Sequence, residues 1–206
     1  MGRNEVLDII ITFANACKKG KEQSFIESEG KKIWSAQYLL NQILRQYYID
    51  DDHILVSKKA QELWDKIAVE SDIKRFDYRK TFTSKVDMEI EMFLGSKIEG
   101  AQTSIKQKQK VVWNNIFHDE HTVPLNVIIK ELCAIEELDY ENVSRILDKI
   151  YICKMLKKED RGIKQKSNRG SNVIEVVEND YTNTENGEPI QICDWEEIKA
   201  RIWKTW

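Results

Sequence analysis

Apolar residues recur at helical spacing in three segments of the N-terminal half. The stripe from Val6 to Cys17 predicts an amphipathic helix, because its apolar residues fall three or four positions apart. A second stripe, Leu39 to Tyr47, follows Ser35, a residue type that caps helix N-termini. A third stripe, Ala60 to Ile67, follows Ser57 in the same way. These stripes predict a compact helical unit, and one interpretation of three packed helices is a helix-turn-helix reader of DNA.

Short apolar runs and further helical stripes alternate in the rest of the chain. Extended segments are expected at residues 53–56, 103–117, 151–156 and 173–177, and helices at residues 86–97, 127–135, 143–150, 157–163 and after Asp194. This order of strand, helical insertion, strand and helix predicts an α+β fold that is rich in helix. We expect a helical region with a DNA-recognition role at residues 1–100 and a catalytic region that ends in a helix at residues 101–206.

The composition is that of a folded, water-soluble chain. Hydrophobic residues make up 41% and charged residues 33% of the 206 positions, which excludes a disordered chain. No apolar run approaches the roughly 18 residues of a membrane span, so no membrane association is expected. The four cysteines lie far apart without a CxxC pair. This pattern argues against a structural zinc site and a disulfide framework, and it fits a reducing cytoplasm.

The net charge of −3 gives no global attraction to nucleic acid, but basic residues are concentrated in two stretches. Lys106 and Lys108 belong to the first stretch. The second runs over residues 154–169 and contains the candidate phosphate contacts Lys154, Lys157, Lys158 and Arg161. A solvated charged face is the commoner explanation of such runs, so they support nucleic-acid binding without requiring it.

The segment from His118 to Leu125 holds two of the chain's three histidines, together with acids and a proline. Glu120 can ligate a metal ion, and His121 can accept a proton near neutral pH. Neighbouring side chains of a strand point to opposite faces, so both can serve one site only where the strand bends or ends. Pro124 gives the strand a reason to end there. The alternative is a surface loop with a few polar residues.

The run Glu120-His121-Thr122-Val123-Pro124-Leu125 is similar to the first strand of the HNH, or ββα-metal, nucleases. In that family an acid or histidine precedes a histidine, which is followed by an apolar residue, proline and often leucine. The resemblance implies that His121 is the general base that activates water and that Glu120 binds a divalent cation. It also implies that Asn142 matches the family's central asparagine, and that the helix after the second strand carries another ligand.

The resemblance weakens beyond the first strand, and the second metal ligand depends on the register. Counting on from Asn142 by the family's usual spacing leads into the apolar run 151–156, which offers no good ligand for a hard cation. If this run is instead the second strand, the metal-bearing helix follows it, and Asp160 or Glu159 stands in place of the family's histidine or asparagine. A carboxylate ligand set favours Mg²⁺ or Mn²⁺.

Phosphodiester hydrolysis needs a base, charge neutralisation at the phosphate and a stabilised leaving oxygen. Neutral His121 can take the proton from water, and a cation held by Glu120 and Asp160 can neutralise charge on the phosphate. Asp119 or His118 either orients His121 or joins the metal ligands. We therefore expect a metal-dependent endonuclease that cuts double-stranded DNA site-specifically, as restriction enzymes do. A two-fold homodimer is the form expected to cut both strands.

Three other interpretations remain open. The main one is a non-catalytic DNA-binding protein with a helix-turn-helix or winged-helix reader. Another is a protein-interaction module that neither cuts nor binds DNA. The last is a nuclease with a different set of charged residues. The spacing of its acids argues against this interpretation, because they lie two positions apart in a predicted helix, and side chains two positions apart on a helix point in different directions. That set is Asp87, Glu89, Glu91, Lys106 and Lys108.

Overall fold

The computed structural model describes residues 3–19, 27–28, 31–32, 35–47, 49–67, 72–75, 116–163, 169–182 and 187–205. Its architecture is α+β, as the sequence predicts. The chain divides into two compact units, each drawn from both halves of the sequence. The helical unit comprises Met1–Ile49, His121–Tyr151 and Gln165–Val176, and the sheet unit comprises Asp50–Glu120, Ile152–Lys164 and Val177–Trp206. The expected boundary near residue 100 lies outside the described residues and stays a prediction.

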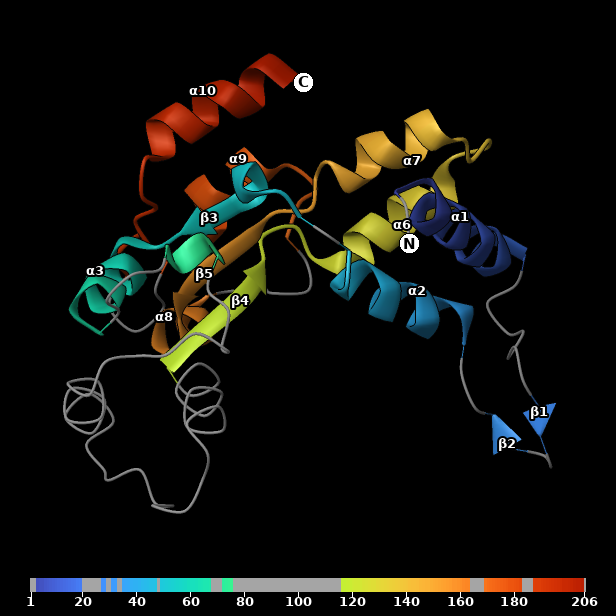
Figure 1. The fold of residues 1–206 in the computed structure, drawn as a ribbon, viewed down its shortest axis with the longest axis horizontal. Coiled ribbons are helices and arrows are strands. Elements are labelled where there is room, and N and C mark those ends of the chain that lie inside the picture. Colours follow the sequence, from blue (N-terminus) through green and yellow to red (C-terminus); the bar gives the residue numbers. More distant parts are fainter. Residues whose placement is uncertain are drawn as a thin grey trace. The chain divides into compact units, whose positions relative to one another are not determined.

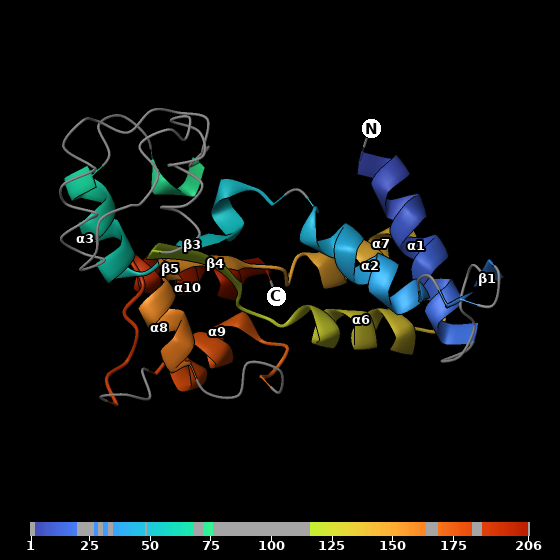
Figure 2. The same ribbon diagram turned by 90° about the horizontal axis from the view of Figure 1, so that it is seen from below.

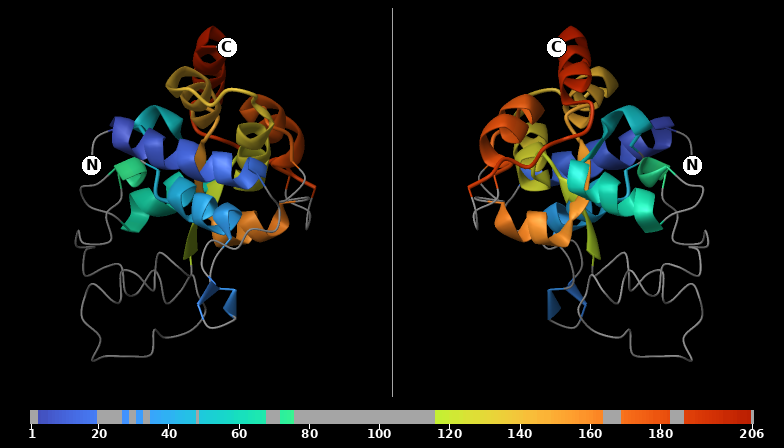
Figure 3. Two further views of the ribbon diagram at one scale, coloured as in Figure 1. Left: turned by 90° about the vertical axis from the view of Figure 1, so that its right-hand side faces the viewer. Right: turned by 90° about the vertical axis from the view of Figure 1, so that its left-hand side faces the viewer.

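The helical unit packs amphipathic helices around a shared apolar core (Figures 1 and 2). Its elements are α1 (Arg3–Lys19), β1 (Glu27–Ser28), β2 (Lys31–Lys32), α2 (Ala36–Arg45), α6 (Leu125–Ala134), α7 (Tyr140–Leu147) and α9 (Val173–Glu175). Helix α1 packs against α2, α6 and α7, and Figure 3 shows α1 and α2 side by side. Strands β1 and β2 form an antiparallel pair.

The predicted apolar stripes are confirmed as the buried faces of these helices. Ile10 of α1, Leu40 and Leu44 of α2 and Leu132 of α6 are each 0% exposed. Ser35 caps α2 as expected, because its side chain accepts a hydrogen bond from the backbone N–H of Tyr38 at 3.1 Å. Along the described parts of the chain, no helix is both long and apolar enough to cross a membrane.

The sheet unit holds a mixed, three-stranded sheet in the order β3-β5-β4. Its elements are η1 (Asp51–His53), β3 (Ile54–Val56), α3 (Lys58–Ile67), η2 (Ile73–Arg75), β4 (Phe117–His121), β5 (Ile152–Leu156), α8 (Lys157–Gly162), the π-helix η3 (Val176–Asp180) and α10 (Trp195–Thr205). Strands β3 and β5 are parallel, with Leu55 opposite Cys153. Helices α3 and α8 both pack against β5, the central strand. The chain passes from one unit to the other after Ile49, Glu120, Tyr151, Lys164 and Val176.

Most of the predicted elements within the described residues are confirmed, including the strands at β3 and β5 and the helices α3, α6, α7, α8 and α10. The strand expected at residues 173–177 is wrong: helix α9 and the start of η3 lie there. Asn172 accounts for the difference. Its side-chain oxygen accepts hydrogen bonds from the backbone N–H groups of Ile174 and Glu175, and this cap begins a helical turn. The helix expected at residues 86–97 and the part of the strand expected at residues 103–115 lie outside the described residues.

An edge-to-face ring contact ties α3 to strand β4. The rings of Trp64 and Phe117 have centroids 5.8 Å apart and planes inclined by 77°. Both side chains are buried, at 2% and 1% exposure. Aromatic pairs in this arrangement stabilise by more than their buried area alone.

We predict that Trp64→Ala lowers the free energy of unfolding by about 3–5 kcal/mol, because it leaves a large cavity between α3 and the sheet. The matched control is Trp203→Ala, at a tryptophan that is 62% exposed on α10, with an expected change within about 0.5 kcal/mol. Urea unfolding followed by circular dichroism measures both. Equal losses in the two variants would contradict the packing described here.

Candidate metal centre

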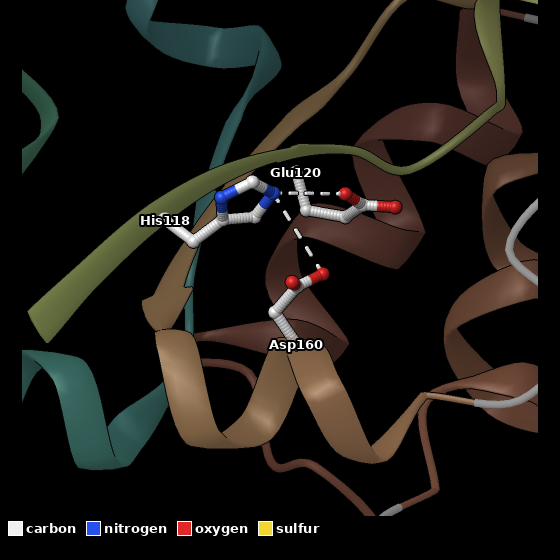
Figure 4. A group of neighbouring side chains, drawn as sticks. All are labelled: His118, Glu120 and Asp160. Carbon is white, nitrogen blue, oxygen red and sulfur yellow. Dashed lines mark hydrogen bonds and ion pairs between the residues drawn. The ribbon is translucent and has the colours of Figure 1, made fainter. Parts of the chain in front are cut away.

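Strand β4 carries alternating side chains to the two faces of the sheet. Phe117 and Asp119 share one face, and His118 and Glu120 share the other, because the side-chain period of a strand is two. Phe117 packs against Trp64 and thereby fixes which face lies against α3. His118 and Glu120 are therefore held side by side on the opposite face, where helix α8 brings Asp160 (Figure 4).

His118, Glu120 and Asp160 converge on a single point. The His118 Nε2 atom lies 3.2 Å from Glu120 Oε2 and 3.7 Å from Asp160 Oδ1. One potential ligand atom from each of the three residues lies within 4.8 Å of the other two. The side chains of Glu120 and Asp160 are only 12% and 9% exposed, whereas that of His118 is 38% exposed. The cluster thus has two shielded carboxylates and one imidazole open to solvent.

Two carboxylates held this close repel each other when both are ionised, so the cluster favours a positive charge between them. A divalent cation fits the donor set. Ligands about 2.1 Å from an octahedral cation are about 3.0 Å apart when adjacent and about 4.2 Å apart when opposite, close to the observed separations. Oxygen ligands with one imidazole suit Mn²⁺ and Mg²⁺, and the imidazole favours Mn²⁺. Protonation of His118 offers the same carboxylates a positive charge without a metal.

Glu159, a predicted metal ligand, has a structural role instead. Its Oε2 atom accepts a hydrogen bond from the Ser57 hydroxyl at 2.6 Å and another from the backbone N–H of Leu156 at 2.9 Å. The Ser57 oxygen in turn accepts the backbone N–H of Ala60 at 3.1 Å, at the start of α3. Glu159 is 4% exposed, so these two donors compensate for the burial of its charge. They fix α8 against the end of β3 and so position Asp160, the next residue.

Cys153 of β5 is buried and is not a member of the cluster. Burial, followed by the nearby carboxylate of Glu159, raises the pKa of the Cys153 thiol well above its usual range. The cluster therefore presents only nitrogen and oxygen donors.

The predicted phosphate contacts fall into three groups. Lys154 is buried, and its Nζ atom pairs with the Asp119 carboxylate at 3.1 Å, which argues against a contact with a bound phosphate. Lys158 and Arg161 are exposed on α8, and Lys157 is half-buried there. The other two predicted contacts, Lys106 and Lys108, lie outside the described residues.

The two remaining predicted catalytic residues are not members of the cluster. His121 ends β4 next to Glu120 and is half-buried. Asn142 lies in the first turn of α7, where its amide nitrogen donates to the Asp139 carboxylate at 3.0 Å and its oxygen accepts from Arg145 at 3.1 Å. These contacts are local to α7, so they give Asn142 a capping role in the helical unit.

His118 belongs to the cluster, whereas the sequence suggested it only as one of two residues that either orient His121 or join the metal ligands. The spacing His118-x-Glu120 on a strand places both side chains on one face, and that signal was available in the sequence. Comparison of the chain with models of protein families, with curated proteins and with solved structures finds no match in any of the three. The case for a metal centre therefore depends on the geometry of these three side chains.

Substitution of the adjacent acids Glu159 and Asp160 should change the free energy of unfolding differently. Urea unfolding at pH 8 without divalent cations measures both changes. Glu159→Ala should lower the free energy of unfolding by about 1–3 kcal/mol for each donor left without an acceptor. Asp160→Asn should leave stability unchanged or raise it, because one of two repelling charges is removed. A greater loss in Asp160→Asn than in Glu159→Ala would reverse the roles assigned here.

Proposed function

We propose that this chain is a metal-dependent DNA endonuclease that hydrolyses phosphodiester bonds, with Mg²⁺ or Mn²⁺ held by His118, Glu120 and Asp160. The observation that carries the proposal is the convergence of these three side chains. The acid-histidine run that resembles the HNH nucleases supplies Glu120. Strands β4 and β5 are neighbours in the sheet and helix α8 follows β5, an order compatible with the ββα arrangement that this resemblance implies once the inserted helices α6 and α7 are set aside.

The bound cation would stabilise negative charge on the phosphate and on the leaving oxygen. His121 is the proposed general base: it follows Glu120 directly in the chain, and a neutral imidazole can accept a proton from the attacking water. His118 and Asp160 act as ligands and need not exchange protons with the substrate. This division gives the two histidines of the segment separate tasks, and variants can distinguish them.

The proposed substrate is double-stranded DNA. Lys158 and Arg161 are exposed and three positions apart on α8, so they share one side of the helix that carries Asp160. With the half-buried Lys157, they provide positive charge on the short helix that also carries Asp160, and contacts from these side chains to DNA phosphates would fix the position of the DNA backbone. Site-specific cutting by a two-fold dimer, as restriction enzymes perform it, is part of the same proposal.

A second candidate function is a non-catalytic DNA-binding protein. The observation in its favour is that protonated His118 can pair with both Glu120 and Asp160 without any metal. The cluster would then only fasten β4 to α8. This function requires that DNA binding be independent of divalent cations and that plasmid DNA remain uncut.

Incubation of supercoiled plasmid with Mg²⁺ or Mn²⁺, and with EDTA as control, tests the nuclease. The parent chain should nick DNA only with a divalent cation. His121→Ala should bind Mn²⁺ like the parent in titration calorimetry but cut about 10²–10⁴-fold more slowly, because only the base is lost. His118→Ala and Asp160→Ala should lose both Mn²⁺ binding and cutting, because each removes a ligand side chain.

The matched control for the histidine variants is His53→Ala, which removes the chain's third histidine, outside the cluster. It should bind Mn²⁺ and cut at the parental rate. Cutting that persists in EDTA, or a His121→Ala variant as active as the parent, would contradict the proposed chemistry. Mn²⁺ binding that survives in His118→Ala and Asp160→Ala alike would show that the ion binds elsewhere.

The role of α8 in DNA binding is tested by its salt dependence. Lys158→Ala and Arg161→Ala should each reduce the slope of log affinity against log salt by about 1, because one phosphate contact is lost. Lys130→Ala, at an exposed lysine of α6, is the control and should leave the slope unchanged. Fluorescence anisotropy with a labelled duplex gives all four slopes. Equal slopes for the parent and both α8 variants would exclude α8 from the phosphate contacts.

A further inference from the structure

Helix α2 has a polar face of unusual composition. Its buried side consists of Ala36, Leu40 and Leu44, which pack in the helical unit. At about 100° per residue, the other side groups its polar residues into one continuous stripe. That stripe consists of Gln37, Tyr38, Asn41, Gln42 and Arg45, all of them exposed except the half-buried Asn41. It contains amide, phenol and guanidinium groups and no carboxylate.

Two other helices of the same unit, α1 and α7, differ in this respect. Helix α1 exposes Glu5 and Asp8, and α7 exposes Glu141. Exposed acids repel the phosphates of DNA, so these two faces are poor candidates for its approach. The face of α2 carries a positive charge at Arg45 and no negative charge, which makes it complementary to a polyanion.

We propose that α2 is the helix that reads base pairs in the major groove of double-stranded DNA. This inference rests on the proposed function in one respect only, namely that DNA is the partner. Arginine recognises guanine, and asparagine or glutamine recognises adenine, each through paired hydrogen bonds to the base edge. An exposed helix face made of these side chains therefore has the chemistry of sequence readout.

The structure holds the proposed reading groups in place. The Nε atom of Arg45 donates to the Asn41 side-chain oxygen at 2.9 Å, one turn earlier on α2. This bond restrains the guanidinium and leaves its two terminal nitrogens at the outer end, where they can meet a guanine edge. The Ser35 cap fixes the first turn, which carries Gln37 and Tyr38. Such preorganisation reduces the entropy lost on binding.

The test is a selection of duplexes from a random DNA library by the full chain in EDTA, where metal-dependent cutting cannot occur. The parent should enrich a sequence motif. Arg45→Ala should weaken the preference at one base pair by about 5- to 150-fold, the range for a lost bidentate contact. Gln37→Ala and Gln42→Ala should relax other positions of the same motif. Each variant is also checked for an unchanged melting temperature, since its side chain is exposed.

The matched control is Arg145→Ala on α7. Arg145 is also exposed and also bonded to an asparagine one turn earlier, Asn142 at 3.1 Å, but Glu141 and Asp148 lie on the same helix region. The motif should survive this change. A motif that persists in the α2 variants, an equal loss of affinity for all sequences, or no enriched motif in the parent would each overturn the inference.

The outcomes for reading and for cutting are separable. An α2-dependent motif without any metal-dependent nicking supports the reading helix and rejects the nuclease. Metal-dependent nicking without an α2-dependent motif supports the nuclease and rejects the reading helix. The two results therefore test the helical unit and the sheet unit independently.

Discussion

The buried hydrogen bond between Ser57 and Glu159 is the interaction on which the candidate site depends. A carboxylate that is 4% exposed must be hydrogen-bonded, and Glu159 satisfies this requirement with the Ser57 hydroxyl and the Leu156 backbone N–H. Helix α8 has only six residues, too few to be stable without tertiary contacts. The anchored glutamate supplies such a contact, and it joins the ends of β3 and β5 to the start of the helix.

The two neighbouring acids of α8 have opposite roles because of helix geometry. Successive side chains of a helix point about 100° apart, so the direction that buries Glu159 turns Asp160 toward another side. There Asp160 meets His118 and Glu120. One acid is neutralised by protein donors and belongs to the framework. The other is placed beside a second carboxylate, an arrangement that favours a cation.

Much of the fold follows from local patterns in the sequence. The stripes of α1, α2 and α3 and the serine caps predicted these helices, because burial of one face imposes a period that a single sequence records. Residues 173–177 show where this reasoning fails. The apolar residues of this segment are all buried, namely Val173, Ile174, Val176 and Val177. Their pattern is therefore compatible with a strand or with a helix, and the side-chain cap at Asn172 favours the helix.

The site was predictable only in part, for a related reason. The sequence indicated Glu120 and Asp160 but could not separate Asp160 from Glu159, since both are acids in the same turn. The two acids differ because Glu159 accepts a hydrogen bond from Ser57, a residue 102 positions away along the chain. Likewise, Lys154 has the charge of a phosphate contact, but its burial against Asp119 depends on the pairing of β4 with β5.

The sequence by itself determined most of the described helices and strands, residues 173–177 excepted, and it determined that an acid-histidine strand precedes a second strand and an acidic helix. Only the tertiary structure decided that His118 joins Glu120 and Asp160 and that Glu159 is an anchor. The physical reason is that periodicity and capping act between neighbours in the chain, whereas charge compensation and ligand geometry act between residues that only folding brings together.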